Sequence, residues 1–106
     1  MLADREDIEE FADAVRNALG DRVEEILLFG SYATGDYVPG SDVDIAVLVT
    51  EKEPGDERAV WDIADRFQAD RGIRVAPKVF KRDAFEEKVS DGFSFHTTVR
   101  EQGVTV

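Results

Sequence analysis

The segment from Val43 to Val49 restricts the fold of this chain most strongly, because six of its seven residues are apolar. A strand with one face in water alternates apolar and polar residues, whereas a nearly continuous apolar run is typical of a strand covered on both faces. The run is far too short to cross a membrane, and no stretch of about 18 apolar residues occurs elsewhere. The pattern therefore predicts a buried strand in a sheet with helices packed against it.

The rest of the chain alternates between helical and extended patterns. Helical spacing of apolar residues predicts helices at 4–19, from about 57 to Gly72, at 83–90 and at 93–100. Extended patterns predict strands at 23–29, 43–49, 73–80 and 104–106. Pro77 interrupts the third strand and indicates an edge position or a bulge, because proline cannot donate to the hydrogen-bond ladder. This order predicts an α/β fold, a small mixed sheet with flanking helices, in a single domain spanning 1–106.

Composition excludes several classes of function. The formal net charge is −11, from 24 acidic and 13 basic residues, which disfavours broad binding to nucleic-acid backbones. The acidic residues are dispersed and only four residues are lysine, a balance that we interpret as that of a halophilic protein. There is no cysteine and one histidine, His96, so neither thiolate chemistry nor a histidine-rich zinc site is expected. Without a visible signal peptide or membrane span, we expect a cytoplasmic protein.

Two short motifs flank the loop between the first two strands. The first strand ends in Gly30-Ser31, and after ten residues Asp42-Val43-Asp44 opens the second strand. Residues two apart in a strand point to the same side, so Asp42 and Asp44 should project together and repel each other. Two carboxylates with phosphate oxygens and water form a natural shell for Mg²⁺. The spacing therefore predicts a metal site at the start of the second strand.

Gly30-Ser31 stands where a strand changes into a helical turn. Glycine permits close approach of a ligand to the backbone, and amides at the start of a helix favour anions. The Ser31 hydroxyl adds a donor for a phosphate. If this turn and the carboxylates act together, the end of the first strand and the start of the second must meet, as in antiparallel neighbours. Tyr32 and Tyr37, close to this turn in the sequence, are then candidates to border the bound ligand, whereas His96 is interpreted as a packing or surface residue.

The stretch from Leu28 to Val47 resembles the signature of the DNA polymerase beta-like nucleotidyltransferase superfamily, and in particular the minimal nucleotidyltransferases of prokaryotes. The resemblance implies a polymerase beta palm-like fold and magnesium-dependent transfer of AMP from ATP, or of another nucleotide, to a hydroxyl. It assigns nucleotide binding to Gly30 and Ser31, metal binding to Asp42 and Asp44, and catalysis to Asp42, Asp44 and Ser31. The joint spacing carries this assignment, since either motif alone also fits an ordinary turn or a solvated strand start.

The resemblance also implies a partner. Small members of this type act on an all-helical HEPN-type toxin, as the antitoxin of a toxin–antitoxin pair, so a hetero-oligomer is expected. The sequence departs from the family pattern at the third carboxylate: Ala76 or Lys78 stands at the equivalent position on the next strand, and neither can bind Mg²⁺. Two alternatives therefore stay open, an antitoxin that acts by binding alone and, less favoured in so short a chain, an enzyme that modifies a small molecule.

Overall fold

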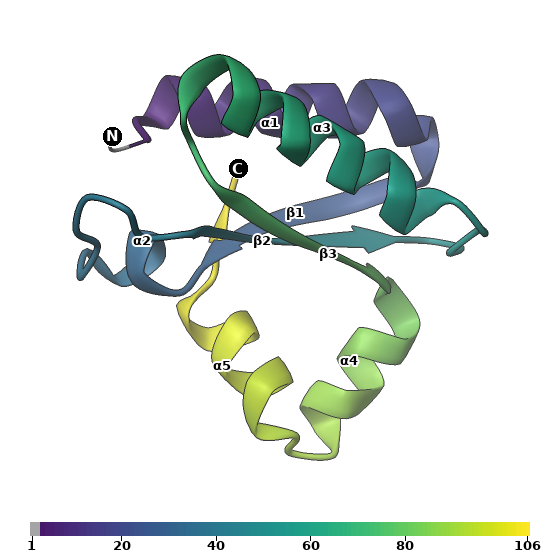
Figure 1. Cartoon of the computed structure of the whole chain (residues 1–106). Coiled ribbons are helices and arrows are strands. Elements are labelled where there is room, and N and C mark those ends of the chain that lie inside the picture. The colour runs from purple at the N-terminus through teal and green to yellow at the C-terminus, as the bar shows by residue number, and fades with distance from the viewer. Residues whose placement is uncertain (1–2) are drawn as a thin grey trace.

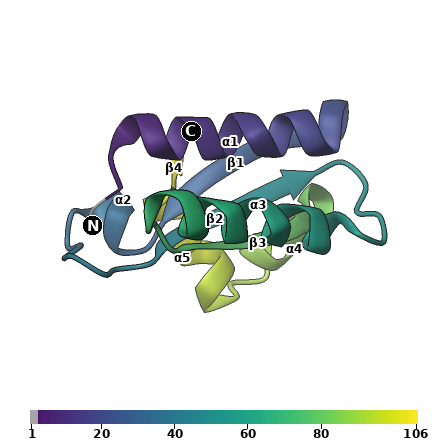
Figure 2. The same ribbon diagram turned by 45° about the horizontal axis from the view of Figure 1, so that its top comes forward.

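A four-stranded sheet lies between two layers of helices in the computed structural model, which describes residues 3–106 (Figure 1). The long helices α1 and α3 run side by side over one face, and the shorter helices α4 and α5 cover part of the other (Figure 2). The elements in chain order are α1 (Arg5–Leu19), the 3-10 turn η1 (Gly20–Arg22), β1 (Val23–Phe29), α2 (Ser31–Thr34), β2 (Val43–Val49), α3 (Asp56–Arg71), β3 (Val75–Lys81), α4 (Arg82–Ser90), α5 (Ser94–Gln102) and β4 (Val104–Thr105).

The strand order is β3-β2-β1-β4, and the sheet is mixed. β1 pairs antiparallel with both β2 and β4, whereas β2 and β3 are parallel neighbours. A parallel pair needs a crossover connection, and α3 provides it between β2 and β3. The predicted α/β class, with a small mixed sheet and flanking helices, is confirmed.

β2 is buried on both faces, as its apolar run predicts. Alternate residues Val43, Ile45, Val47 and Val49 enter the larger core, which α1 and α3 cover. The intervening residues Ala46 and Leu48 enter a smaller core on the opposite face; its other buried members are Leu27, Phe85 and Val99. Because successive side chains of a strand point to opposite faces, Asp44 lies on the face of the smaller core.

β3 is an edge strand, as Pro77 predicts. Proline tolerates such a position because one side of an edge strand makes no ladder hydrogen bonds. Val75, Pro77 and Val79 are buried under α3, whereas Lys78 on the other face is exposed. On the face of β3 that is turned toward α4 and α5, Ala76 is half-buried and Lys78 is exposed, so the first half of the strand is accessible from that side.

An ion pair joins Arg22, the last residue of η1, to Asp56, the first residue of α3. Asp56 is buried, with 4% of its surface exposed, and its carboxylate accepts two hydrogen bonds from Arg22, at 2.8 and 2.9 Å. The amide of Glu53 donates to the same carboxylate at 2.7 Å. The Arg22 guanidinium is the main reason why the pKa of Asp56 lies below its usual range.

Among the helices in residues 3–106, none has the length and apolar character that a bilayer crossing requires.

Candidate functional site

The two aspartates of the motif lie at the point where β1 ends and β2 begins. Asp42 directly precedes β2, and Asp44 is its second residue. In the antiparallel register of β1 and β2, Phe29 lies opposite Asp44, so Gly30 follows directly beside the carboxylates. The structure therefore brings together the two ends that the motif spacing predicts to meet.

Gly30 has a backbone conformation and a location that only glycine fits. Its φ is 72° and its ψ is −154°, a region that residues with a side chain rarely adopt. A Cβ atom placed on Gly30 would stand 2.2 Å from Oδ2 of Asp44 and 3.2 Å from its Cγ. The backbone at Gly30 and the carboxylate of Asp44 are thus in direct contact, with no room for an intervening methyl group.

The short helix α2 starts at this contact. The Gly30 carbonyl accepts hydrogen bonds from the amides of Ala33 and Thr34 at 3.0 and 3.2 Å, and Gly35, at φ 86°, ends the turn. The first amides of a helical turn have no acceptor within the turn, which leaves them available to an anion. Ser31 is half-buried here, next to Gly30 and on the same turn.

A tight turn positions Asp42 from the other side. The Ser41 hydroxyl oxygen accepts a hydrogen bond from the amide of Val38 at 3.0 Å, and the Ser41 amide donates to the Val38 carbonyl at the same distance. The backbone then enters β2, where the Val43 amide donates to the carbonyl of Arg74 at 2.8 Å. These bonds fix the chain on both sides of Asp42.

The electrostatics of the pair favour a cation. Burial raises the pKa of Asp44, the neighbouring charge of Asp42 raises it further, and Lys78 acts in the opposite direction. Two carboxylates on one face supply the hard oxygen ligands that Mg²⁺ prefers. Within residues 3–106 no cluster of three or more acidic or histidine side chains could hold a metal alone. Asp42 and Asp44 could therefore supply two ligands to a divalent ion, and the remaining ligands would have to come from water and substrate oxygens.

The neighbouring strand has no third acid at this site. In the parallel register of β2 and β3, Ala76 lies beside Asp44, and Lys78 lies beside Ala46, one pair further into the sheet. Arg74 precedes β3, and its Nη1 is 3.5 Å from Oδ1 of Asp42. Of the two positions that the sequence leaves open for the third carboxylate, Ala76 is the one next to Asp44.

Sequence patterns give no indication of the aromatic side chains beside the carboxylates. The ring of Phe95, from α5, meets Phe29 edge-on, with 5.7 Å between ring centroids. Nζ of Lys78 is 5.2 Å from the centroid of the same Phe95 ring. Phe95 is 39% exposed although it packs on the sheet. Its position could not be predicted, because α5 reaches the site only through tertiary packing.

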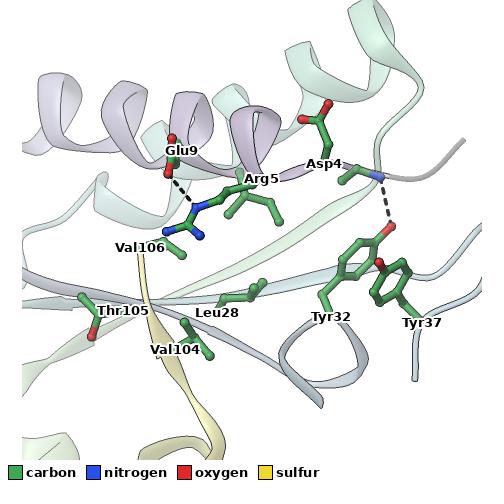
Figure 3. A pocket seen from close by; sticks show the side chains of 11 residues that line it. Asp4, Arg5, Glu9, Leu28, Tyr32, Tyr37, Val104, Thr105 and Val106 are labelled. Atoms are coloured by element: carbon green, nitrogen blue, oxygen red, sulfur yellow. Dashed lines mark hydrogen bonds and ion pairs between the residues drawn. The ribbon is translucent and has the colours of Figure 1, made fainter. Parts of the chain in front are cut away.

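Tyr32 and Tyr37 lie on the other face of the sheet. Their rings stack at 4.4 Å with 4° between planes, and the Tyr32 hydroxyl accepts a hydrogen bond from the amide of Ala3 at 3.1 Å. Together with Leu28 and the start of α1 they line a cavity of about 570 Å³ (Figure 3). Asp44 projects from the opposite face, so the structure does not support the interpretation that these rings border a nucleotide held by the carboxylates.

His96 is a packing residue, as predicted. It lies among four phenylalanine rings at centroid distances between 5.0 and 6.1 Å, and burial lowers its pKa. These rings are Phe80, Phe85, Phe93 and Phe95. A neutral imidazole among aromatic rings contributes to the packing of α4 against α5 rather than to the carboxylate site.

A mixed sheet with paired aspartates at the start of its central strand, beside a Gly-Ser turn, is the arrangement of a nucleotidyltransferase. Residues 8–101 match the model of the nucleotidyltransferase domain family, so the chain belongs to that family. Two similar proteins of Methanocaldococcus jannaschii both bear the name "Putative protein adenylyltransferase". One is 33% identical over 96 residues, which cover 91% of this chain and 90% of the relative. The other is 37% identical over 76 residues, 71% of this chain and 77% of the relative.

Proposed function

We propose that this protein transfers AMP from ATP to a hydroxyl group of a HEPN-type helical toxin, and thereby acts as the antitoxin of the pair. The observation that carries the proposal is the contact between Gly30 and Asp44, because it joins a turn suited to phosphate to a pair of carboxylates suited to a metal. The names of the two relatives support the choice of a protein as the acceptor.

The proposed transfer of AMP needs ATP and the acceptor hydroxyl and no other reactant. The acceptor hydroxyl oxygen attacks the α-phosphorus of ATP, and the bond from that phosphorus to the oxygen bridging the α- and β-phosphates breaks. Pyrophosphate leaves with the bonding electrons, and the hydroxyl proton passes to solvent. The product is a phosphodiester between AMP and the acceptor side chain.

Each motif residue has a distinct role in this proposal. The amides at Gly30 and Ser31 and the Ser31 hydroxyl hold the triphosphate. Asp42 and Asp44 bind Mg²⁺, which neutralises negative charge on the phosphate oxygens when it is bound. Because Asp44 touches the backbone of Gly30, the residues that would hold the metal and those that would hold the triphosphate are direct neighbours.

One observation favours the second candidate, an antitoxin that neutralises the toxin by binding alone. Ala76 lies beside Asp44, so the described residues offer two carboxylates to a metal and no third. A slow or absent transfer step would still leave the nucleotide-binding turn and a protein surface for the partner. Complex formation is common to both candidates, so only a covalent product distinguishes them.

The test is transfer of label from α-labelled ATP, with Mg²⁺ and high salt, in the presence and absence of the helical partner. High salt is included because we propose a halophilic, cytoplasmic origin for this acidic surface. Label on the partner is expected with the unmodified protein and is expected to disappear in the variants Asp42→Asn and Asp44→Asn. Asp36→Asn, in the same loop region, is the matched control and should retain transfer.

Tight complex formation without label would overturn the enzymatic proposal and support the binding antitoxin. Label that persists in both aspartate variants would overturn the assignment of the site. If the aspartate variants lose label and also lose neutralisation of the toxin in cells, the transfer reaction is the means of neutralisation.

A further inference from the structure

The start of β3 places two cations and a small residue alongside the carboxylates of β2. Arg74 lies next to Asp42, Ala76 lies opposite Asp44, and Lys78 lies opposite Ala46. Side chains two residues apart on one strand point to the same face of the sheet, and so do register partners on neighbouring strands. On the β3 side, the neighbour of Asp44 is therefore Ala76, which offers only a methyl group, and a basic residue stands two positions before it and two positions after it.

Lys78 is held in this position by packing. Its Nζ is 5.2 Å from the Phe95 ring centroid, within the range of a cation–π interaction. Phe95 in turn packs against Phe29, whose register partner is Asp44. A chain of side-chain contacts therefore runs from Lys78 through Phe95 to Phe29, the register partner of Asp44. Lys78 makes no ion pair with an acidic side chain in residues 3–106, so its ammonium is available to a ligand.

A triphosphate brings more negative charge than one divalent ion can offset. The two carboxylates that bind such an ion already neutralise much of its positive charge. Residues 3–106 contain no cluster of three acidic or histidine side chains that could bind a metal ion. Of the two basic residues at the start of β3, Arg74 already faces Asp42. Lys78 is the other of these two residues, and it is close enough to Asp44 to lower the pKa of that carboxyl, against the effect of burial.

We infer that Lys78 binds a phosphate group of the bound triphosphate, beside Asp44, where the β3 neighbour Ala76 has only a methyl group. This inference rests on the proposed function, since it requires a nucleoside triphosphate at the site. The ammonium supplies positive charge at a point where a third carboxylate would have supplied a metal ligand. Lysine suits this role because it reaches phosphate as a point charge on a flexible stem.

The test is calorimetric titration with two probes, magnesium ATP and magnesium tripolyphosphate, the second of which has no base or sugar. Lys78→Met keeps the apolar stem against Phe95 and removes the charge. Its affinity for both probes is expected to fall about tenfold or more, the scale of one lost hydrogen bond between charged groups. Lys78→Arg keeps the charge and should recover part of the affinity.

Lys81→Met is the matched control, because Lys81 belongs to the same strand, pairs with Glu51 at 3.7 Å and lies at the far end from Asp44. It should bind both probes like the unmodified protein. Circular dichroism and thermal melting of each variant check that it is folded.

Two results would overturn the inference alone. Unchanged affinity of Lys78→Met for both probes would show that Lys78 does not contact phosphate. Loss for ATP with no loss for tripolyphosphate would show that Lys78 acts through Phe95 on the base. If the unmodified protein binds neither probe in the presence of Mg²⁺, the proposed function fails, and the inference fails with it.

Discussion

Gly30→Ala should disturb both the fold and the carboxylate pair, and two separate costs can be worked from the structure. The backbone at Gly30, with φ 72° and ψ −154°, lies in a region where a residue with a side chain loses about 1–3 kcal/mol. The new methyl group would also stand 2.2 Å from Oδ2 of Asp44, and forcing a group into filled space costs about 1–3 kcal/mol. The free energy of unfolding should therefore fall by about 2–6 kcal/mol.

Gly35→Ala separates the two costs. Gly35 also has a positive φ, of 86°, but a Cβ atom there meets nothing within 4 Å. Its alanine variant should lose only the conformational cost, about 1–2 kcal/mol for a left-handed residue. Urea denaturation followed by circular dichroism measures both variants under the same conditions.

A double-mutant cycle with Asp44→Ala isolates the contact itself. In the Asp44→Ala background the obstructing carboxylate is gone, so Gly30→Ala should cost about 1–3 kcal/mol less than in the unmodified protein. A coupling energy within about 0.5 kcal/mol of zero would refute the reasoning, because it would mean that the methyl group and the carboxylate do not compete for space.

Four further expectations follow from the same structure. Ala76→Asp should raise Mn²⁺ affinity roughly tenfold or more, since affinity grows with the number of charged ligands; calorimetry with Ala76→Asn as control tests it, and equal affinities would contradict the register argument. Asp42→Asn should lower the pKa of Asp44 toward, but not to, its ordinary value, because burial remains; a carboxyl titration by NMR that finds no change would contradict this cause. Asp56→Asn should cost about 3 kcal/mol at neutral pH, since it removes the buried carboxylate that accepts two hydrogen bonds from Arg22 and leaves Arg22 only its longer ion pair with Glu53. The folded-state pKa of Asp56 is lowered, so this stabilisation is present above about pH 4 and is lost as the pH falls further, and the variant should lose less stability on acidification; a parallel acid profile would contradict it. Raising KCl from about 0.1 M to about 1 M shortens the Debye length from about 10 Å to about 3 Å and should raise the Tm of this chain of net charge −11; a Tm that stays constant or falls would argue against self-repulsion.

Sequence patterns were sufficient for the order of helices and strands along the chain and for the burial of β2 on both faces. The apolar run of β2 needs cover on both faces, and α1 with α3 on one side and α4 with α5 on the other provide it. Pro77 predicted an edge position or a bulge, and the structure has the edge position. Such predictions succeed because hydrophobic periodicity and backbone restrictions act between residues that are near one another along the chain.

The candidate site divides in the same way. The spacing of Gly30-Ser31 and Asp42-Val43-Asp44 predicted that the end of β1 and the start of β2 meet, and the antiparallel register agrees with it. The sequence could not choose between Ala76 and Lys78 as the neighbour of Asp44. That choice depends on how β3 aligns with β2, across a connection that includes all of α3.

By itself the sequence determined the class of fold and the pair of motifs, because both depend on local spacing and on which residues avoid water. Only the tertiary structure decided that Gly30 touches Asp44 and that Lys78 and Phe95 lie beside the carboxylates. It also decided that the stacked rings of Tyr32 and Tyr37 lie on the opposite face of the sheet. The physical reason is that register and helix docking are fixed by packing between segments far apart in the chain, where a one-residue shift moves every side chain of a strand to the opposite face.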